Sequence, residues 1–243
     1  MSSAVQTDAA PFDSVRDLAA AVPAGDMVAA EKVRDALLMV GRAGDFGQLE
    51  KAAIWLATWQ KQFPPRIEKP RLAIFAGAHG LTRHGVSLST DADTHAHIAG
   101  LRAGTAPLAC IAAQNNAEIK VFELAVDKPT PNIATEPAMN ERECAATIAY
   151  GFEAVAEKPD ILALGVMGAG IGTAAAAIAC ALYGGTVDYW VRPGPGTPSD
   201  VSANRIKLVE EALELHQGKL EGPLDILCCL GGREIAACVG AIL

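Results

Sequence analysis

From residue 70 onward, short apolar runs alternate with helix-like segments, and few folds accommodate that alternation. Two of the runs, DILALGV at 160–166 and DILCCLG at 225–231, are apolar almost throughout rather than at every second position. Such runs are typical of strands buried on both faces, as in a parallel sheet covered by helices. We therefore expect an α/β fold with an open, doubly wound, mostly parallel sheet.

The alternation predicts five strands and five helices in this part of the chain. The strands are expected at residues 71–76, 118–126, 160–166, 186–191 and 225–230. The helices are expected at residues 103–114, 140–156, 173–183, 202–216 and 233–243. Asn140 followed by Glu143 is typical of a helix start, and Gly184 is typical of a position just past a helix end.

The first 65 residues show a different pattern of apolar residues. Their apolar side chains recur at helical spacing, for example at Phe46, Leu49, Ala53 and Leu56. The pair Pro64-Pro65 then interrupts the pattern. We expect two parts: an N-terminal helical segment, residues 1–65, that belongs to a small domain, and an α/β domain, residues 66–243.

Composition and charge exclude several classes of protein. The 243 residues are 51% hydrophobic, which suits a packed core, and the net charge of -8 argues against binding of nucleic acid. The N-terminus lacks the pattern of a secretory signal, and the longest apolar stretch, residues 174–183, is too short for a membrane span. We expect a cytoplasmic protein with no membrane partner, whose six cysteines are reduced and mostly buried.

Three of the expected strands end in glycine-rich turns, at residues 165–173, 192–197 and 231–232. A backbone without Cβ atoms can approach a phosphate closely, and a helix that begins there offers free N–H groups. The carboxyl ends of parallel strands meet at one edge of a sheet. The three turns therefore predict a site for a phosphorylated small molecule at that edge.

Other motifs are weaker. Residues 170–175 match the G-x-G-x-x-A pattern of dinucleotide-binding oxidoreductases, but the acidic residue that should follow would be Asp188, inside an expected strand rather than at its end. A metal site is one interpretation of Asp91, Asp93, His95 and His97. The same pattern equally fits acidic residues in the first turn of a helix, followed by exposed histidines. We expect neither a metal nor a cofactor.

Several short motifs occur in a distinctive order: GDFGQLE at 44–50, AGAHG at 76–80, HGVS at 84–87, EPAM at 136–139, VMGAGIGT at 166–173 and LGGREIA at 230–236. From about residue 30 onward, their order and spacing resemble the nicotinate-nucleotide–dimethylbenzimidazole phosphoribosyltransferases of cobalamin lower-ligand synthesis. The resemblance implies a Rossmann-like large domain, a small helical domain and a homodimer. It also implies that a benzimidazole nitrogen attacks C1′ of nicotinate mononucleotide and displaces nicotinate with inversion, while a glutamate acts as general base.

The resemblance assigns two groups of site residues. Those expected to hold the phosphoribosyl group are Gly168, Gly170, Thr173, Gly194, Gly196, Lys207 and Gly232. If the loop before Lys207 aligns differently, Arg205 takes its place. Those expected to line the pocket for the aromatic base are Ser89, His97, Met167 and Ala169.

The chain departs from the family pattern at four places. Ala78 and Val166 stand where the family has an acid and a glutamate, and Ile171-Gly172 replaces Asn-Thr. The family's base glutamate belongs to a segment that follows the position of Leu243. No catalytic residue is assigned, although Glu234 is the one acid expected near a ligand-facing turn. The departures favour a second hypothesis, a non-catalytic ligand-binding or regulatory relative.

Overall fold

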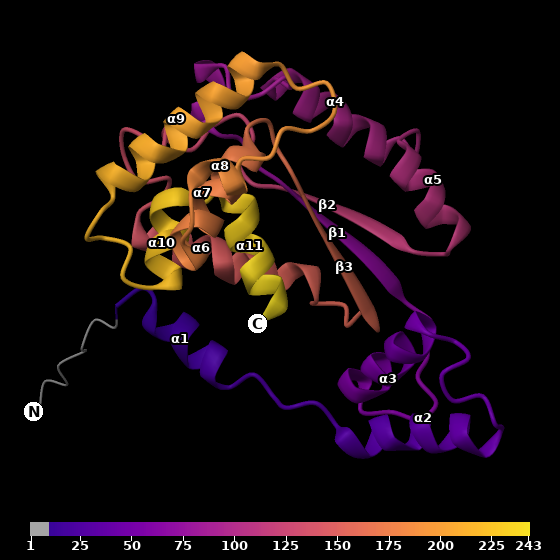
Figure 1. Ribbon diagram of the computed structural model, residues 1–243. Helices are drawn as coiled ribbons and strands as arrows, with labels where there is room; N and C mark the ends of the chain where they lie inside the picture. Colours follow the sequence, from indigo (N-terminus) through magenta and orange to yellow (C-terminus); the bar gives the residue numbers. More distant parts are fainter. Residues whose placement is uncertain (1–9) are drawn as a thin grey trace, which may run out of the picture.

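Three parallel strands form the centre of the computed structural model, which describes residues 10–243 (Figure 1). They are β1 Pro70–Ala76, β2 Glu118–Glu123 and β3 Ile161–Met167, in the order β2-β1-β3. In the parallel register, Phe75 of β1 lies opposite Phe122 of β2 and Val166 of β3. The expected α/β fold with a parallel sheet is confirmed.

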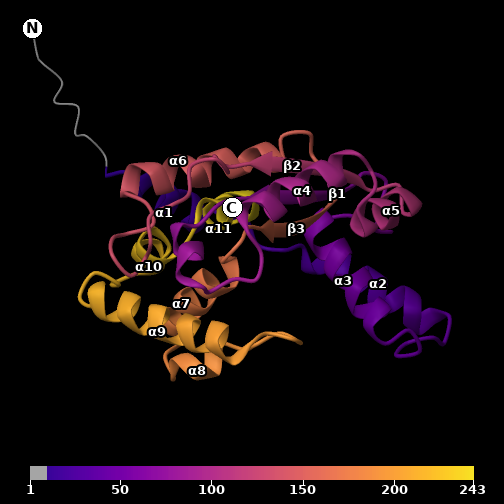
Figure 2. The same cartoon turned by 90° about the horizontal axis from the view of Figure 1, so that it is seen from above.

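Helices surround the sheet (Figure 2). They are α1 Asp13–Ala20, α2 Met27–Met39, α3 Gln48–Gln60, α4 Asp91–Arg102, α5 Pro107–Gln114, α6 Glu141–Gly151, α7 Ile171–Tyr183, α8 Val187–Trp190, α9 Ser199–Leu215, α10 Pro223–Leu230 and α11 Arg233–Ile242, with 3-10 helices η1 Gly80–His84 and η2 Phe152–Ala154. Phe75 packs against Ala237 of α11, whereas its neighbour Ala76 packs against Ile98 of α4. Because successive side chains of a strand point to opposite faces, α11 and α4 cover opposite faces and the sheet is doubly wound.

Two expected strands are wrong, because residues 186–191 and 225–230 form the helices α8 and α10. All of the last five residues of α10 are buried, so its apolar run reflects burial in a helix rather than in a strand. In α8, the indole of Trp190 donates a 2.7 Å hydrogen bond to the carbonyl of Gly184 and stacks on Tyr183, which closes the segment into one helical turn. Asp188 therefore lies in α8 and not on a strand.

Helix boundaries follow local signals closely. The helix expected at 103–114 begins instead at Pro107, a residue suited to the first helical position, and α4 precedes it. The predicted cap of α6 is confirmed, since the side chain of Asn140 accepts a 2.8 Å hydrogen bond from the N–H of Glu143. The expected end of α7 is also confirmed, because the helix stops before Gly184.

The N-terminal helices pack in two places. Phe12 and Val15, at the start of α1, pack against Cys144 of α6 and Leu227 of α10. The helices α2 and α3 pack on each other and lie to one side of the body, near the start of β1 (Figure 1). Within residues 10–243, no helix is long and apolar enough to span a membrane.

The helices α6 and α11 cross at close range through small residues. A Cβ atom added at Gly240 of α11 would overlap the carbonyl of Ile148 in α6, and its distance from that carbonyl carbon would be 2.7 Å. A Cβ atom added at Gly151 of α6 would likewise overlap the carbonyl of Ala237. This contact fixes α11, whose first turn lies at the carboxyl end of the sheet.

Candidate functional site

The carboxyl ends of β1 and β3 lie side by side, and the chain leaves both strands through glycine turns. The N–H of Gly77 donates a 3.0 Å hydrogen bond to the carbonyl of Met167. A Cβ atom added at Gly168 would lie 2.6 Å from the carbonyl oxygen of Gly77. Because β2 and β3 lie on opposite sides of β1, the winding direction reverses between β1 and β3. In open α/β sheets, ligands bind in the crevice at such a point.

The start of α7 forms one wall of this crevice. Gly170 caps the helix in the left-handed conformation, with φ of 85°. No side chain caps the first turn, in which the N–H groups of Ile171 and Thr173 donate to the backbone carbonyls of Gly168 and Gly170. Thr173 in that turn is buried, and its hydroxyl has no hydrogen-bond partner among the described residues. A helix start without a side-chain cap presents the positive end of the helix dipole and is suited to binding an anion.

A hollow of about 370 Å³ opens beside the start of α7 and contains two arginines. It is lined by Gly172, Tyr189, Trp190, Val191, Arg192 and Arg205. Arg205 is held in place by the chain, since its Nε donates a 2.6 Å hydrogen bond to the carbonyl of Val86. Within the part of the chain that the structure describes, neither arginine forms an ion pair with a carboxylate. Both guanidinium groups are therefore available to an anionic ligand.

The residues expected to hold the phosphoribosyl group lie in several different settings. Gly168, Gly170 and Thr173 lie at the carboxyl end of β3 and the start of α7. Gly194 and Gly196 lie in the loop between α8 and α9, which does not follow a strand. The side chain of Lys207 is 76% exposed and lies 3.8 Å from Glu211 in the same helix, so it is Arg205 that lines the hollow.

The residues expected to line the base pocket lie around α4 and the end of β3. Met167 packs against Ala76 and Ile98, and Ala169 is buried. Ser89 and His97 are exposed, just before α4 and on it. The helix reaches the turn after β3 through Thr94, whose hydroxyl accepts a 3.3 Å hydrogen bond from the N–H of Ala169.

A buried ionisable pair that the sequence reasoning missed lies beneath these turns. Nε2 of His79, after β1, lies 2.9 Å from Oε1 of Glu234 in the first turn of α11, and both side chains are fully buried. A Cβ atom added at Gly232 would lie 2.5 Å from Cε1 of His79 and 2.8 Å from Oε2 of Glu234. Gly232 therefore lies against the pair. His79 belongs to the motif AGAHG and Glu234 to the motif LGGREIA. The position of these motifs at the end of a strand and the start of a helix was the sequence signal that could have indicated the pair.

The positions that depart from the family pattern also lie at this edge. Ala78 is buried directly after β1, whereas Val166 is 45% exposed near the end of β3. Val166 thus places a partly exposed apolar side chain, rather than a charged one, near the end of β3. No group of three or more His, Cys, Asp or Glu side chains within residues 10–243 could hold a metal ion.

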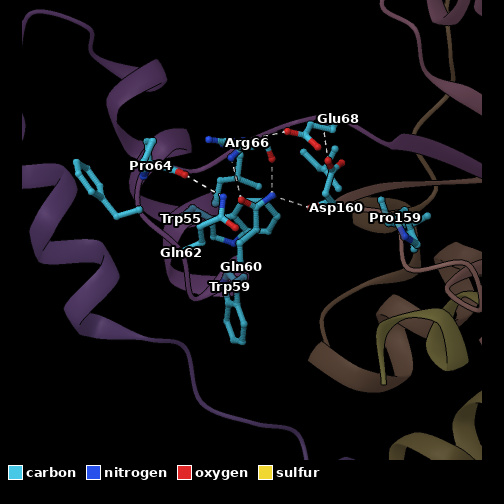
Figure 3. Close-up of a pocket in the computed structure, with 13 residues that line it drawn as sticks. Trp55, Trp59, Gln60, Gln62, Pro64, Arg66, Glu68, Pro159 and Asp160 are labelled. Atoms are coloured by element: carbon cyan, nitrogen blue, oxygen red, sulfur yellow. Dashed lines mark hydrogen bonds and ion pairs between the residues drawn. The ribbon is translucent and has the colours of Figure 1, made fainter.

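A larger hollow lies at the opposite end of the sheet (Figure 3). It has a volume of about 760 Å³ between α3 and the amino end of β3, where Asp160 and Pro159 line it. Trp55 and Trp59 form its aromatic side, and the side chain of Gln60 holds the backbone of Arg66 through two hydrogen bonds. A strand of seven residues spans roughly 20 Å. The larger hollow is therefore separate from the glycine turns.

Comparisons with known proteins agree on one family. The profile of the DBI_PRT phosphoribosyltransferase family matches residues 19–243. The chain is 46% identical over 235 residues to the nicotinate-nucleotide–dimethylbenzimidazole phosphoribosyltransferase of Agrobacterium fabrum, covering 96% of this chain and 68% of that protein. The corresponding values for the Brucella canis protein of the same name are 43% identity over 234 residues, 96% and 69%.

Solved structures extend the similarity to three dimensions. The chain is similar to CobT from Thermus thermophilus with a TM-score of 0.73 and 28% identity, over 82% of this chain and 65% of that one. A second structure from the same organism, a nicotinate-nucleotide–dimethylbenzimidazole phosphoribosyltransferase, gives a TM-score of 0.71 and is covered over 64% of its length. The chain thus spans about two thirds of the length of the relatives it matches.

Proposed function

Because the chain belongs to the nicotinate-nucleotide–dimethylbenzimidazole phosphoribosyltransferase family, we propose that it transfers the phosphoribosyl group of nicotinate mononucleotide to a benzimidazole-type base. The products are nicotinate and α-ribazole phosphate. A bond forms between a nitrogen of the base and C1′ of the ribose, and the bond from C1′ to the nicotinate nitrogen breaks. The electron pair of that bond stays with nicotinate, and the attacking base loses a proton.

The observation that best supports this proposal is the combination of the uncapped start of α7 with the arginine-lined hollow beside it. A mononucleotide carries one phosphate, which such a helix start and a guanidinium group can bind together. Arg205 is fixed by its bond to Val86 and lines the hollow beside the same turn, so we propose that it is the cation nearest the phosphate.

Turnover by the purified chain tests the proposal. Nicotinate mononucleotide and 5,6-dimethylbenzimidazole are incubated with the chain, and nicotinate and α-ribazole phosphate are separated by chromatography. Arg205→Met should lower kcat/KM by about 10- to 100-fold, because a hydrogen bond to a charged group contributes about 1.5–3 kcal/mol. Lys207→Met should have a smaller effect, and Arg142→Met, an exposed arginine on α6, is the control.

Val166 supports a second candidate function, a relative that binds the ligand without turning it over. The two functions differ in the same assay. Ligand-dependent thermal stabilisation without product would favour the binding relative, whereas product formation would exclude it. If the chain neither forms product nor binds either substrate, both candidates are wrong.

We propose further that the protein works as a homodimer in the cytoplasm. The unpaired state of all six cysteines supports a reducing compartment. Exposed aromatic side chains around the larger hollow, including Trp55 and Trp59, support contact with a second copy. We also propose that residues 66–243 carry the site and that α2 and α3 form a smaller helical part, whereas α1 packs against α6 and α10 of the larger part.

A further inference from the structure

The pair formed by His79 and Glu234 joins segments that are 155 residues apart. His79 follows the central strand β1, and Glu234 lies in the first turn of α11. The two partners bond through one nitrogen and one oxygen, and Nδ1 of His79 and Oε2 of Glu234 have no hydrogen-bond partner among the described residues. Each side chain therefore depends on the other for its polar contact.

Glycines from three different turns enclose the pair. Gly77 and Gly232 lie directly against the carboxylate of Glu234, where a Cβ atom would overlap it. Gly168 contacts the carbonyl of Gly77, and a Cβ atom there would lie 3.7 Å from Cδ2 of His79. The turn after β1, the turn after β3 and the start of α11 thus meet at these two side chains.

Anchoring of α11 does not require this pair. The neighbouring residue Arg233 already joins the start of α11 to α6 through a 2.7 Å ion pair with Glu143, and it also donates to the carbonyl of Lys128. Burial of an ionisable pair is costly in free energy and is weak evidence for a stabilising role. A role in holding the turns in register accounts for its position.

We propose that His79 and Glu234 are positioning residues, which hold the three glycine turns so that the backbone at Gly168–Gly170 faces the phosphoribosyl group. They do not reach the ligand, because both are fully buried. The assignment of that ligand rests on the proposed function, whereas the effect on the turns does not. Loss of the pair should therefore loosen a turn distant in sequence and weaken binding of the nucleotide.

The first test is hydrogen–deuterium exchange of the ligand-free chain, which needs no turnover. Glu234→Ala should speed exchange of the amides of Ala169, Ile171 and Thr173 by about 10-fold or more, since these amides are hydrogen-bonded and local opening becomes easier. His216→Ala is the matched control: His216 is also buried, and its Nε2 is 2.9 Å from the carbonyl of Ile133. If the control changes residues 168–173 to the same extent, or Glu234→Ala changes only residues near 234, the proposal is wrong.

The second test separates positioning from loss of folding. His79→Gln keeps a donor near the position of Nε2 and should retain binding of nicotinate mononucleotide better than His79→Ala. In enzyme assays KM for the nucleotide should rise about 10-fold or more in His79→Ala, with a smaller change in kcat. The double variant should lose little beyond either single variant, because the two residues act as one unit. If the losses of nucleotide binding in the two single variants add up in the double variant, or if His79→Gln binds no better than His79→Ala, the two residues do not act as one unit and the proposal is wrong.

Exchange and activity together identify which proposal fails. If the unchanged chain shows no turnover but Glu234→Ala still loosens residues 168–173, the proposed function is wrong and the positioning role stands. If the unchanged chain turns over and Glu234→Ala alters neither exchange nor KM, the positioning role is wrong and the function stands.

Discussion

The thiol of Cys238 lies one helical turn after Glu234 in α11. Burial, together with the negative charge of Glu234, raises its pKa to about 11. The folded chain therefore keeps this proton at alkaline pH values where the unfolded chain, with an ordinary thiol, has lost it. Since the unfolded state binds fewer protons there, the free energy of unfolding should fall as pH rises from about 9 to about 11.

Urea unfolding across this pH range measures the effect. Cys238→Ala should make the decline of stability with pH shallower, since one raised thiol has been removed. Cys110→Ala, at an exposed position, should leave the slope unchanged. Burial also raises the pKa of Cys180 and Cys229, so a residual slope is expected. Parallel slopes for the original chain and Cys238→Ala would contradict the prediction.

Single residues differ in how well the sequence reveals them. Gly168 and Gly170 are visible because glycine at a strand-to-helix junction has a local reason to be there. The pairing of His79 with Glu234 has no local signature, because it depends on the meeting of β1 with α11. Arg205 and Lys207 are two residues apart on a helix, and only the side of α9 that faces the hollow distinguishes them.

At the scale of elements, the close crossing of α6 and α11 is sensitive to a single methyl group. Gly240→Ala should lower the free energy of unfolding by about 1–3 kcal/mol or more, because the new Cβ overlaps the backbone of α6. Gly172→Ala, in the first turn of α7, meets no atom within 4 Å and should be neutral or stabilising by up to about 1 kcal/mol. Urea denaturation measures both. Equal free energies of unfolding for the two variants would show that α6 and α11 can move apart without loss of stability.

Two similar segments show why the sequence predicts elements only in part. DILALGV at 160–166 forms most of β3, whereas DILCCLG at 225–231 forms most of α10 and its end. Short apolar runs fit a buried strand or a buried helix equally well, and partners in the fold decide between them. β3 pairs along its length with β1, while α10 begins at Pro223, a residue suited to the first turn of a helix.

At the scale of the whole molecule, the aromatic side of the larger hollow is a prominent exposed apolar feature of α3. Trp55 and Trp59 are 53% and 50% exposed. If a second copy covers them, Trp55→Ser and Trp59→Ser should each weaken dimerisation by about 10-fold or more, as expected for tryptophan in an interface. Sedimentation at several concentrations measures the change.

The control for this experiment is Leu215→Ser, which replaces an exposed apolar side chain at the end of α9. Its dimerisation should match that of the unchanged chain. A chain that remains monomeric at every concentration, or tryptophan variants that associate as strongly as the control, would show that this surface has another role.

The central place of β1 in the sheet also constrains how the chain folds during synthesis. β1 is the first strand of the sheet to leave the ribosome, yet both of its hydrogen-bonding partners follow it in the chain, and α11, which covers one of its faces, comes last. Contacts between distant segments form slowly, and unpaired strands are prone to aggregate before they form. The nascent chain must therefore carry β1 without a partner until β2 has left the ribosome, and with one open edge until β3 has followed. A chaperone that shields this strand during that interval should raise the yield of folded protein.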